Sequence, residues 1–151
     1  MYNLCAINGG KRLIGYSRDG AYAQYFTIPA TNLHPFDPGK ITFKEAALVD
    51  TLACPINAMS KVHFTFNTTV VVVGCGSAGL LFLQLAGLKG AKQIISIEPN
   101  ESRRALSEKL GASIALDPGA TNFEADLRAI LPEKDLVVIE AAGTGRVPSL
   151  H

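Results

Sequence analysis

A run of four valines followed by three closely spaced glycines constrains this chain more than any other feature. The segment Thr69–Gly79 reads TVVVVGCGSAG, and a leucine-rich stretch follows it. Consecutive β-branched residues are typical of a strand that is buried on both faces, whereas the leucine-rich stretch is typical of a helix. The pattern therefore predicts a strand, a glycine turn and a helix, in that order.

The glycines have the spacing G-x-G-x-x-G, and each has its own physical task. Gly74 permits a tight turn, Gly76 lets backbone N–H groups approach a pyrophosphate, and Gly79 lets the helix pack closely on the strand. Ser77 and Ala78 begin the helix, where the positive end of the helix dipole faces an anion. We expect these five residues to bind the phosphates of a dinucleotide.

A carboxylate follows at the distance that a dinucleotide site requires. The stretch Gln93–Glu98 reads QIISIE, which predicts a second strand that ends in an acid. Such an acid accepts hydrogen bonds from both hydroxyls of an adenosine ribose. A solvated acid at a strand end is the alternative interpretation, and the glycine turn favours ribose binding. Glu98 also favours NAD over NADP, because a 2′-phosphate would meet a like charge.

The alternation of strand and helix continues to the end of the chain. We expect a helix capped by Asn100 and running through Leu110, a strand at Ser113–Leu116, a helix over 123–131 and a strand at Leu136–Glu140. This series predicts an α/β fold with a parallel sheet of strand order 3-2-1-4. Two further strands normally complete such a domain. We therefore expect the last strand to be an open edge, and the chain to be the middle of a longer protein.

The part of the chain before residue 61 has a different pattern. The segment Tyr22–Ile28 predicts a strand, entered through a turn at Asp19–Gly20. Thr42–Glu45 has the pattern of a capping box that opens a helix. A second helix is expected over Pro55–Lys61, because proline is tolerated in the first turn of a helix and not further in.

Composition excludes several classes of function. The net charge of +1, without a basic run, argues against nucleic acid or an acidic membrane surface as a partner. The segment Phe64–Leu88 carries no charged residue, but its glycines and polar residues favour a buried strand and helix over a membrane span. Three widely separated cysteines do not make a disulfide framework, and no secretory signal is visible. A cytoplasmic protein is expected.

Several segments of the chain form one recognisable series: Asn3–Cys5, Ile14–Gly15, Arg18–Gly20, Ala23–Tyr25, Ala30–Leu33, Glu45–Cys54, Gly74–Gly79, Glu98 and Lys109–Ala112. Together these segments resemble the medium-chain dehydrogenase family, particularly its zinc-dependent alcohol and polyol branch, which includes sorbitol-type enzymes. The resemblance implies a partial Rossmann domain over residues 62–151. It also implies part of a GroES-like β catalytic domain, with its linker helix, over residues 1–61.

The resemblance implies two residues with roles at zinc ions. Asp50 matches the position of a catalytic-zinc ligand or of a carboxylate beside that metal, and Cys5 matches the last cysteine of a structural zinc lobe. The alternative for Asp50 is a helix N-cap. Catalytic zinc needs three protein ligands and a water. We therefore expect zinc only in a full-length relative, where other segments supply the remaining ligands.

Three further residues have alternative interpretations. By the resemblance, Arg103 lies near the adenosine ribose, and an ordinary exposed helix arginine is its alternative. Cys54 lies near the nicotinamide in the family, with packing as an equal alternative. Cys75 sits inside the glycine turn, where a helix N-terminus could lower its pKa, although we interpret it as a small filler residue.

The function implied by the resemblance is hydride transfer between an alcohol or polyol and NAD, by a full-length enzyme that would form a homo-oligomer. The chain by itself is not expected to be catalytic. One alternative is a zinc-free quinone reductase of the same family, against which Cys5 and Asp50 argue. Another is a non-catalytic, truncated remnant that at most binds a nucleotide. The sequence does not identify which alcohol would be the substrate.

Overall fold

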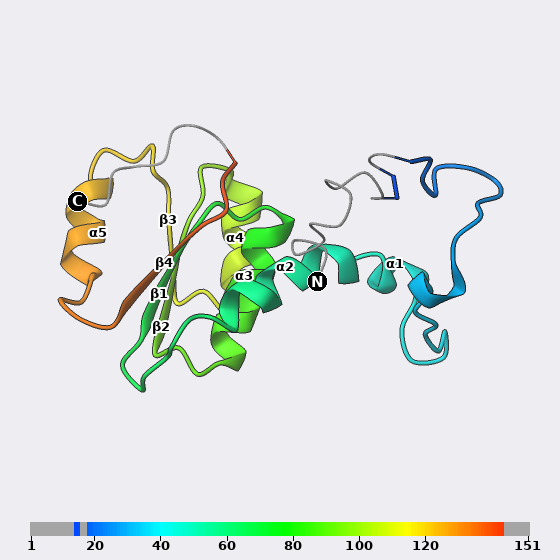
Figure 1. The fold of residues 1–151 in the computed structure, drawn as a ribbon. Helices are drawn as coiled ribbons and strands as arrows, with labels where there is room; N and C mark the ends of the chain where they lie inside the picture. Colours follow the sequence, from blue (N-terminus) through cyan, green and yellow to red (C-terminus); the bar gives the residue numbers. More distant parts are fainter. Residues whose placement is uncertain (1–13, 16–17, 144–151) are drawn as a thin grey trace. The chain divides into compact units, whose positions relative to one another are not determined.

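The structure, a computed structural model, describes residues 14–15 and 18–143 (Figure 1). The chain consists of two compact units, Met1–Ile41 and Thr42–His151. The predicted domains, 1–61 and 62–151, have a later boundary than these units. The domain boundary at residues 61 and 62 stays a prediction.

The predicted strand at Tyr22–Ile28 is wrong. Its residues form bends and irregular backbone, and the side chains of Tyr22 and Tyr25 are almost fully exposed. A strand needs a neighbour to satisfy its N–H and C=O groups. The described residues of the first unit supply only an isolated bridge between Ile14 and Arg18 and one 3-10 turn, η2 (Ala30–Asn32).

The capping box at the start of the second unit is confirmed. It opens the short helix α1 (Phe43–Ala46). The backbone N–H of Thr42 donates to Glu45 Oε2 at 2.7 Å, and the N–H of Glu45 donates to Thr42 Oγ1 at 3.2 Å. The hydrogen bonds from the Thr42 backbone and hydroxyl hold the pKa of the Glu45 carboxyl below its usual value.

The second predicted helix exists, but its predicted start is wrong. Helix α2 runs over Val49–Met59, so Pro55 lies inside it. An internal proline costs about 3 kcal/mol in an isolated helix because it removes a backbone hydrogen bond and crowds the preceding turn. Tertiary packing outweighs this cost here, since Pro55 and Met59 are buried and α2 packs against α3 (Ser77–Leu88).

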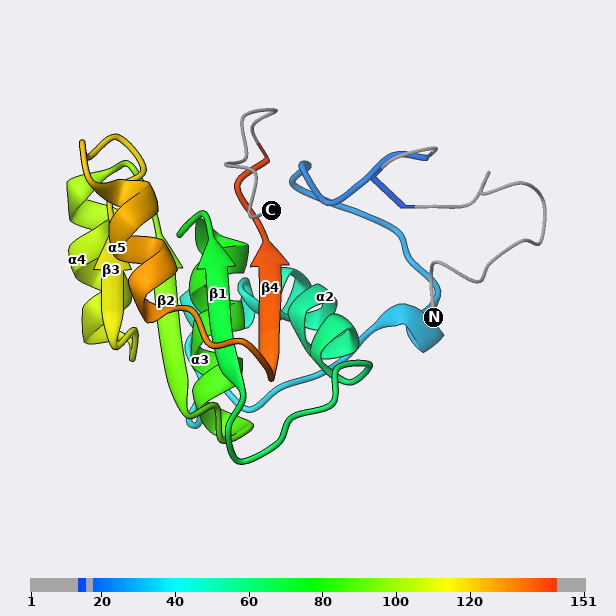
Figure 2. The ribbon, with the colours of Figure 1, turned by 90° about the vertical axis from the view of Figure 1, so that its left-hand side faces the viewer.

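The second unit is built on a four-stranded parallel sheet, as predicted. Its strands are β1 (Thr69–Val73), β2 (Gln93–Ile97), β3 (Ile114–Leu116) and β4 (Leu136–Glu140). They lie in the order β3-β2-β1-β4, which Figure 2 shows from the side of α5. Thr69 pairs with both Gln93 and Leu136, so β1 is central and entirely buried, and β4 is an edge of the described sheet.

Helices cover both faces of this sheet. Besides α2 and α3, they are α4 (Glu101–Lys109), which Asn100 caps as predicted, and α5 (Phe123–Ile130). Figure 1 shows α5 on one face and the other three on the opposite face. Alternate residues of β1 point to the two faces, as expected for a doubly covered strand.

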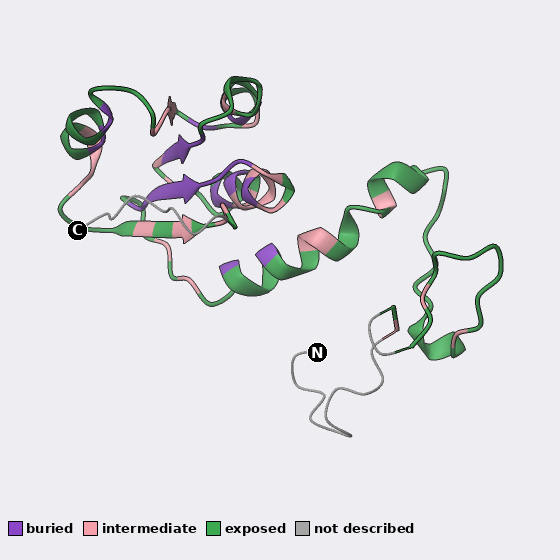
Figure 3. Cartoon of the chain, turned by 90° about the horizontal axis from the view of Figure 1, so that it is seen from above, coloured by how far each residue is buried: buried purple, intermediate pink, exposed green. Residues whose placement is uncertain are grey.

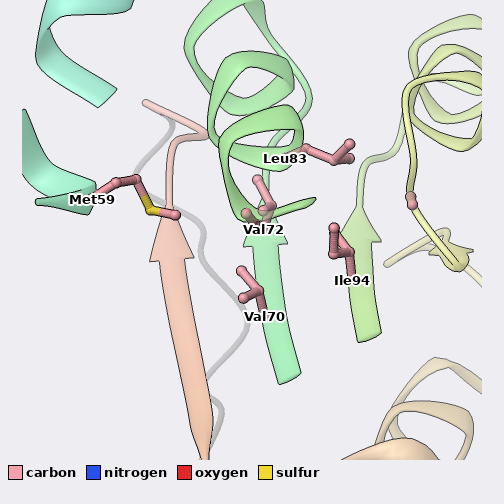
Figure 4. Packing of buried hydrophobic residues seen from close by; sticks show 7 residues of the cluster. Met59, Val70, Val72, Leu83 and Ile94 are labelled. Atoms are coloured by element: carbon pink, nitrogen blue, oxygen red, sulfur yellow. The ribbon is translucent and has the colours of Figure 1, made fainter. Parts of the chain in front are cut away.

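Each face has its own hydrophobic core. Val70 and Val72 pack with Leu83, Ile94 and Met59, as Figure 4 shows. The core on the other face is formed by Val71, Val73, Ile95, Ile97, Phe123 and Leu127. The predicted apolar face of the 123–131 helix is therefore confirmed, with its two buried members packing onto the sheet.

A lysine joins the ends of two helices. Nζ of Lys89 donates to the carbonyl oxygens of Met59 at 2.6 Å and Val62 at 2.9 Å, and lies 4.9 Å from the centre of the Phe64 ring. This cation satisfies carbonyls at the end of α2, where the helix dipole is negative. Among the described residues, no helix is long and apolar enough to cross a membrane.

Candidate functional site

The glycine turn lies at the carboxyl end of β1, and its first glycine is held by neighbouring strands. The Gly74 N–H donates to the Ile97 carbonyl at 2.8 Å. Gly74 has φ +89°, and a Cβ at this position would lie 2.6 Å from the Cα of Ala142. A side chain here would therefore be both strained and obstructed, which supports the tight-turn task predicted for Gly74.

The other two glycines differ in the space around them. A Cβ on Gly79 would overlap the carbonyl oxygen of Gly74, so the absence of a side chain lets α3 approach the turn. A Cβ on Gly76 would meet no atom within 4 Å, although its backbone, with φ −71° and ψ −173°, would accept any residue. Gly76 thus faces open space that a ligand could fill.

A cleft of about 220 Å³ lies at the carboxyl ends of the strands. Its lining residues are Val73, Gly74, Gly76, Ile97, Glu98, Pro99, Arg103, Pro118, Ala141 and Ala142. Ligands of open α/β sheets bind in this position. Four predicted site residues, Gly74, Gly76, Glu98 and Arg103, therefore line one cleft.

The remaining predicted phosphate-binding residues form the first turn of α3. Ser77, Ala78 and Gly79 follow Gly76, which is the N-cap residue of this helix. No side chain caps this end of α3. Free N–H groups and the helix dipole make such a helix end suited to an anion.

Glu98 is buried and already engaged with the backbone. Its carboxylate accepts the Cys75 N–H on Oε2 at 2.7 Å and the Asn100 N–H on Oε1 at 3.0 Å. The side chain is 4% exposed. Glu98 thus ties the glycine turn to the loop between β2 and α4, a task that sequence reasoning missed. The G-x-G-x-x-G pattern with a distant acid carried no signal for it.

Arg104 is a second residue that the sequence did not single out. Its Nη1 donates to the carbonyl of Glu98 at 2.8 Å and to that of Pro99 at 3.0 Å, and lies 3.4 Å from Asp117 Oδ2. Adjacent arginines in a helix look alike in sequence. Their roughly 100° angular separation gives them different surroundings.

The thiol of Cys75 is buried beneath the turn. Burial raises its pKa, and the negative charge of Glu98 adds to the shift. The suggestion that a helix N-terminus lowers this pKa is therefore wrong, because burial and the charge of Glu98 raise it. The interpretation of Cys75 as a small filler residue agrees with its burial.

The residues assigned to zinc are not assembled into a metal site in the described part of the chain. Asp50 is exposed in the first turn of α2, and Leu48 is the N-cap, so the N-cap interpretation of Asp50 is wrong. Residues 14–15 and 18–143 contain no group of three His, Cys, Asp or Glu that could hold a metal. Among the described residues, Asp50 alone does not supply the three protein ligands that a catalytic zinc needs. Cys5 lies outside the described residues, and Cys54 is exposed on α2.

Curated relatives of the chain are polyol and alcohol dehydrogenases, although no protein-family model matches it. It is 35% identical over 118 residues to D-arabitol-phosphate dehydrogenase of Enterococcus avium, covering 77% of this chain and 32% of that relative. It is 30% identical over 132 residues to sorbitol dehydrogenase of Halalkalibacterium halodurans, covering 87% and 36%. The chain thus spans about a third of the length of these relatives.

Solved structures give the same relationship. A zinc-binding dehydrogenase from Sinorhizobium meliloti bound to NADP is 30% identical, with a TM-score of 0.70 over 87% of this chain and 39% of that one. Galactitol-1-phosphate dehydrogenase from Escherichia coli is 25% identical, with a TM-score of 0.68 over 86% and 38%. Over the part of those proteins that it spans, the chain is therefore similar to zinc-binding, alcohol and polyol dehydrogenases.

Proposed function

We propose that the second unit binds NAD(H) and forms the cofactor-binding part of an alcohol or polyol dehydrogenase. The observation that carries the proposal is the open space in front of Gly76, which lies between the uncapped end of α3 and the cleft lined by Glu98. A glycine whose missing side chain leaves a cradle beside a helix N-terminus is suited to a pyrophosphate.

Each part of the dinucleotide has proposed partners in this chain. Backbone N–H groups from Gly76 to Gly79 bind the pyrophosphate, and Gly74 shapes the turn beneath it. Glu98 accepts the ribose hydroxyls on lone pairs that its two backbone hydrogen bonds leave over, since an ionised carboxylate has about four acceptor sites. Arg103, exposed on α4, lines the same cleft and lies beside the ribose.

Cofactor preference follows from the charges in the cleft. A buried carboxylate at the ribose repels a 2′-phosphate, and the guanidinium of Arg103 attracts it. The carboxylate is held in place by two backbone donors, whereas Arg103 is solvent-exposed and screened. We therefore propose NAD as the preferred cofactor, with a modest rather than absolute preference.

The activity proposed for this chain is cofactor binding. The nicotinamide supplies hydride chemistry, and this chain's residues orient the adenosine and pyrophosphate that anchor it. Oxidation of an alcohol or polyol, homo-oligomer formation and a cytoplasmic location are proposed for a protein that includes the rest of the relatives' length.

Calorimetric titration of the folded chain with NADH and NADPH tests this proposal. We expect saturable NADH binding, with NADPH weaker. The variant Gly76→Val should weaken NADH binding at least tenfold, because the valine side chain occupies the cradle. Valine is a poorer N-cap residue than glycine, so the variant should melt slightly earlier, and it is titrated at a temperature where it is folded. Gly87→Ala, on the same helix but away from the cleft, should bind as the unmodified chain does. A chain that melts cooperatively and binds neither cofactor would refute the proposal.

A further inference from the structure

Arg104 connects the ends of two strands without lining the cleft between them. One nitrogen, Nη1, contacts the carbonyls of Glu98 and Pro99 beyond β2 and the carboxylate of Asp117 beyond β3. Glu98, Pro99 and Pro118, which follows Asp117, are all lining residues of the cleft. The guanidinium is thus hydrogen-bonded to the backbone carbonyls of two lining residues, Glu98 and Pro99. It also pairs with Asp117, which directly precedes the lining residue Pro118.

A buried hydroxyl relay fixes the helix backbone at Arg104. The Ser107 hydroxyl donates to the Arg104 carbonyl at 2.6 Å, and the Ser96 and Ser107 oxygens are 2.7 Å apart. Since the Ser107 hydrogen is already used, Ser96 is the donor of this second bond. Both serines are fully buried. The relay therefore ties α4 to the interior of β2, and sets the point from which the arginine side chain extends.

The two adjacent arginines divide their tasks. Arg103 is exposed and lines the cleft, whereas the Arg104 side chain is 20% exposed and its donors face backbone carbonyls. We propose that Arg104 is a positioning residue, which holds the adenosine side of the cleft in its binding shape and does not touch the ligand. This inference rests on the proposed function, because it concerns the same cleft.

The test uses variants of the whole chain, titrated with NADH and with ADP-ribose at a temperature where each is folded. We expect Arg104→Met to weaken the binding of both ligands about tenfold. Arg104→Lys should recover part of the affinity, because its ammonium still reaches carbonyl acceptors with a single charged group. Lys109→Met, an exposed change on the same helix, is the matched control and should leave affinity unchanged.

A spectroscopic measurement separates positioning from a merely structural role. The amide N–H signals of Cys75 and Asn100 report on the Glu98 carboxylate that they bind. We expect both signals to shift in Arg104→Met while the fold remains intact. A folded Arg104→Met with a lower melting temperature but unchanged affinity and unchanged amide signals would overturn the inference.

A milder variant covers the case in which Arg104→Met does not fold. Asp117→Asn removes the ion pair but keeps the side-chain oxygen that accepts the Gly119 N–H. Asp117→Asn should weaken the binding of ADP-ribose about threefold. An unchanged affinity of this variant also overturns the inference. Failure of the unmodified chain to bind NADH refutes the proposed function and the inference with it. When the unmodified chain binds NADH, unchanged affinity in either folded variant refutes the inference alone.

Discussion

The two units of this chain show how differently similar hydrophobic content can be used. In the described part of the first unit, residues 14–15 and 18–41, no residue is buried, and Tyr22 and Tyr25 face solvent. In the second unit, all five residues of β1 are buried, and Figure 3 shows the buried residues gathered in the sheet and its helices. Each face of this sheet has its own core. In a parallel β-α series, each strand pairs with another strand of the same series. An isolated strand-like segment needs a pairing strand from another part of the protein.

The strongest way to break the second unit is to remove a buried leucine. Leu83→Ala should lower the free energy of unfolding by about 3 kcal/mol, because Leu83 is fully buried between α3 and the sheet. Leu88→Ala on the same helix is the control, since Leu88 is 84% exposed. Urea unfolding followed by far-UV circular dichroism measures both. Equal losses in the two variants would contradict the assigned core.

The next largest effect concerns the closeness of α3 to the glycine turn. Gly79→Ala should cost about 2 kcal/mol or more, because its Cβ would overlap the Gly74 carbonyl, which is backbone and cannot move aside cheaply. Gly87→Ala, where the added Cβ meets only the Ile94 side chain at 3.7 Å, should gain about 0.5 kcal/mol. Thermal unfolding of the pair checks the sign as well as the size. A stabilising Gly79→Ala would be inconsistent with this packing.

A smaller effect concerns how α2 is held within the second unit. Lys89→Met should lower stability by about 1 kcal/mol, because it removes hydrogen bonds to the Met59 and Val62 carbonyls at an exposed position. In Lys89→Met, amide hydrogen exchange should become faster in α2 and change less in the sheet. Lys92→Met, also exposed, is the control. Unchanged exchange in α2 would mean that this lysine does not hold the helix in place.

The smallest effect is expected in the first unit. Tyr25→Ala should change the free energy of unfolding by less than about 0.5 kcal/mol, because the side chain is 93% exposed. Urea unfolding measures this as well. A loss as large as that of Leu83→Ala would show that Tyr25 is packed in solution, and would remove the contrast between the units.

The sequence predicted the second unit well because its signals are local. Each element has a signal of its own, such as the four valines, the acid at the end of the next strand and the capping asparagine. The right-handedness of parallel crossovers then determines the order of the strands. The strand predicted at Tyr22–Ile28 failed because pairing is not a local property. The start of α2 was misplaced because burial of Pro55 outweighed its local cost.

The sequence predicted residues that line the cleft, but not the hydrogen bonds that hold those residues in place. Gly74, Gly76 and Glu98, which a spacing rule predicts, line one cleft with Arg103, which the family resemblance implied. The bond from Cys75 to Glu98 and the contacts of Arg104 depend on how loops from separate strands approach each other. No spacing rule contains that information.

The pairing of β1 has a consequence for the protein during its synthesis. Both of its neighbours, β2 and β4, lie downstream in the sequence, so Thr69–Val73 leaves the ribosome before either partner does. A nascent chain that has emerged as far as Gly90 exposes five β-prone residues without a charge, a segment of the kind that aggregates. One edge is covered once Ile97 emerges, and the other waits until Glu140. A strand that is entirely buried in the folded protein is therefore exposed at both edges early in its synthesis.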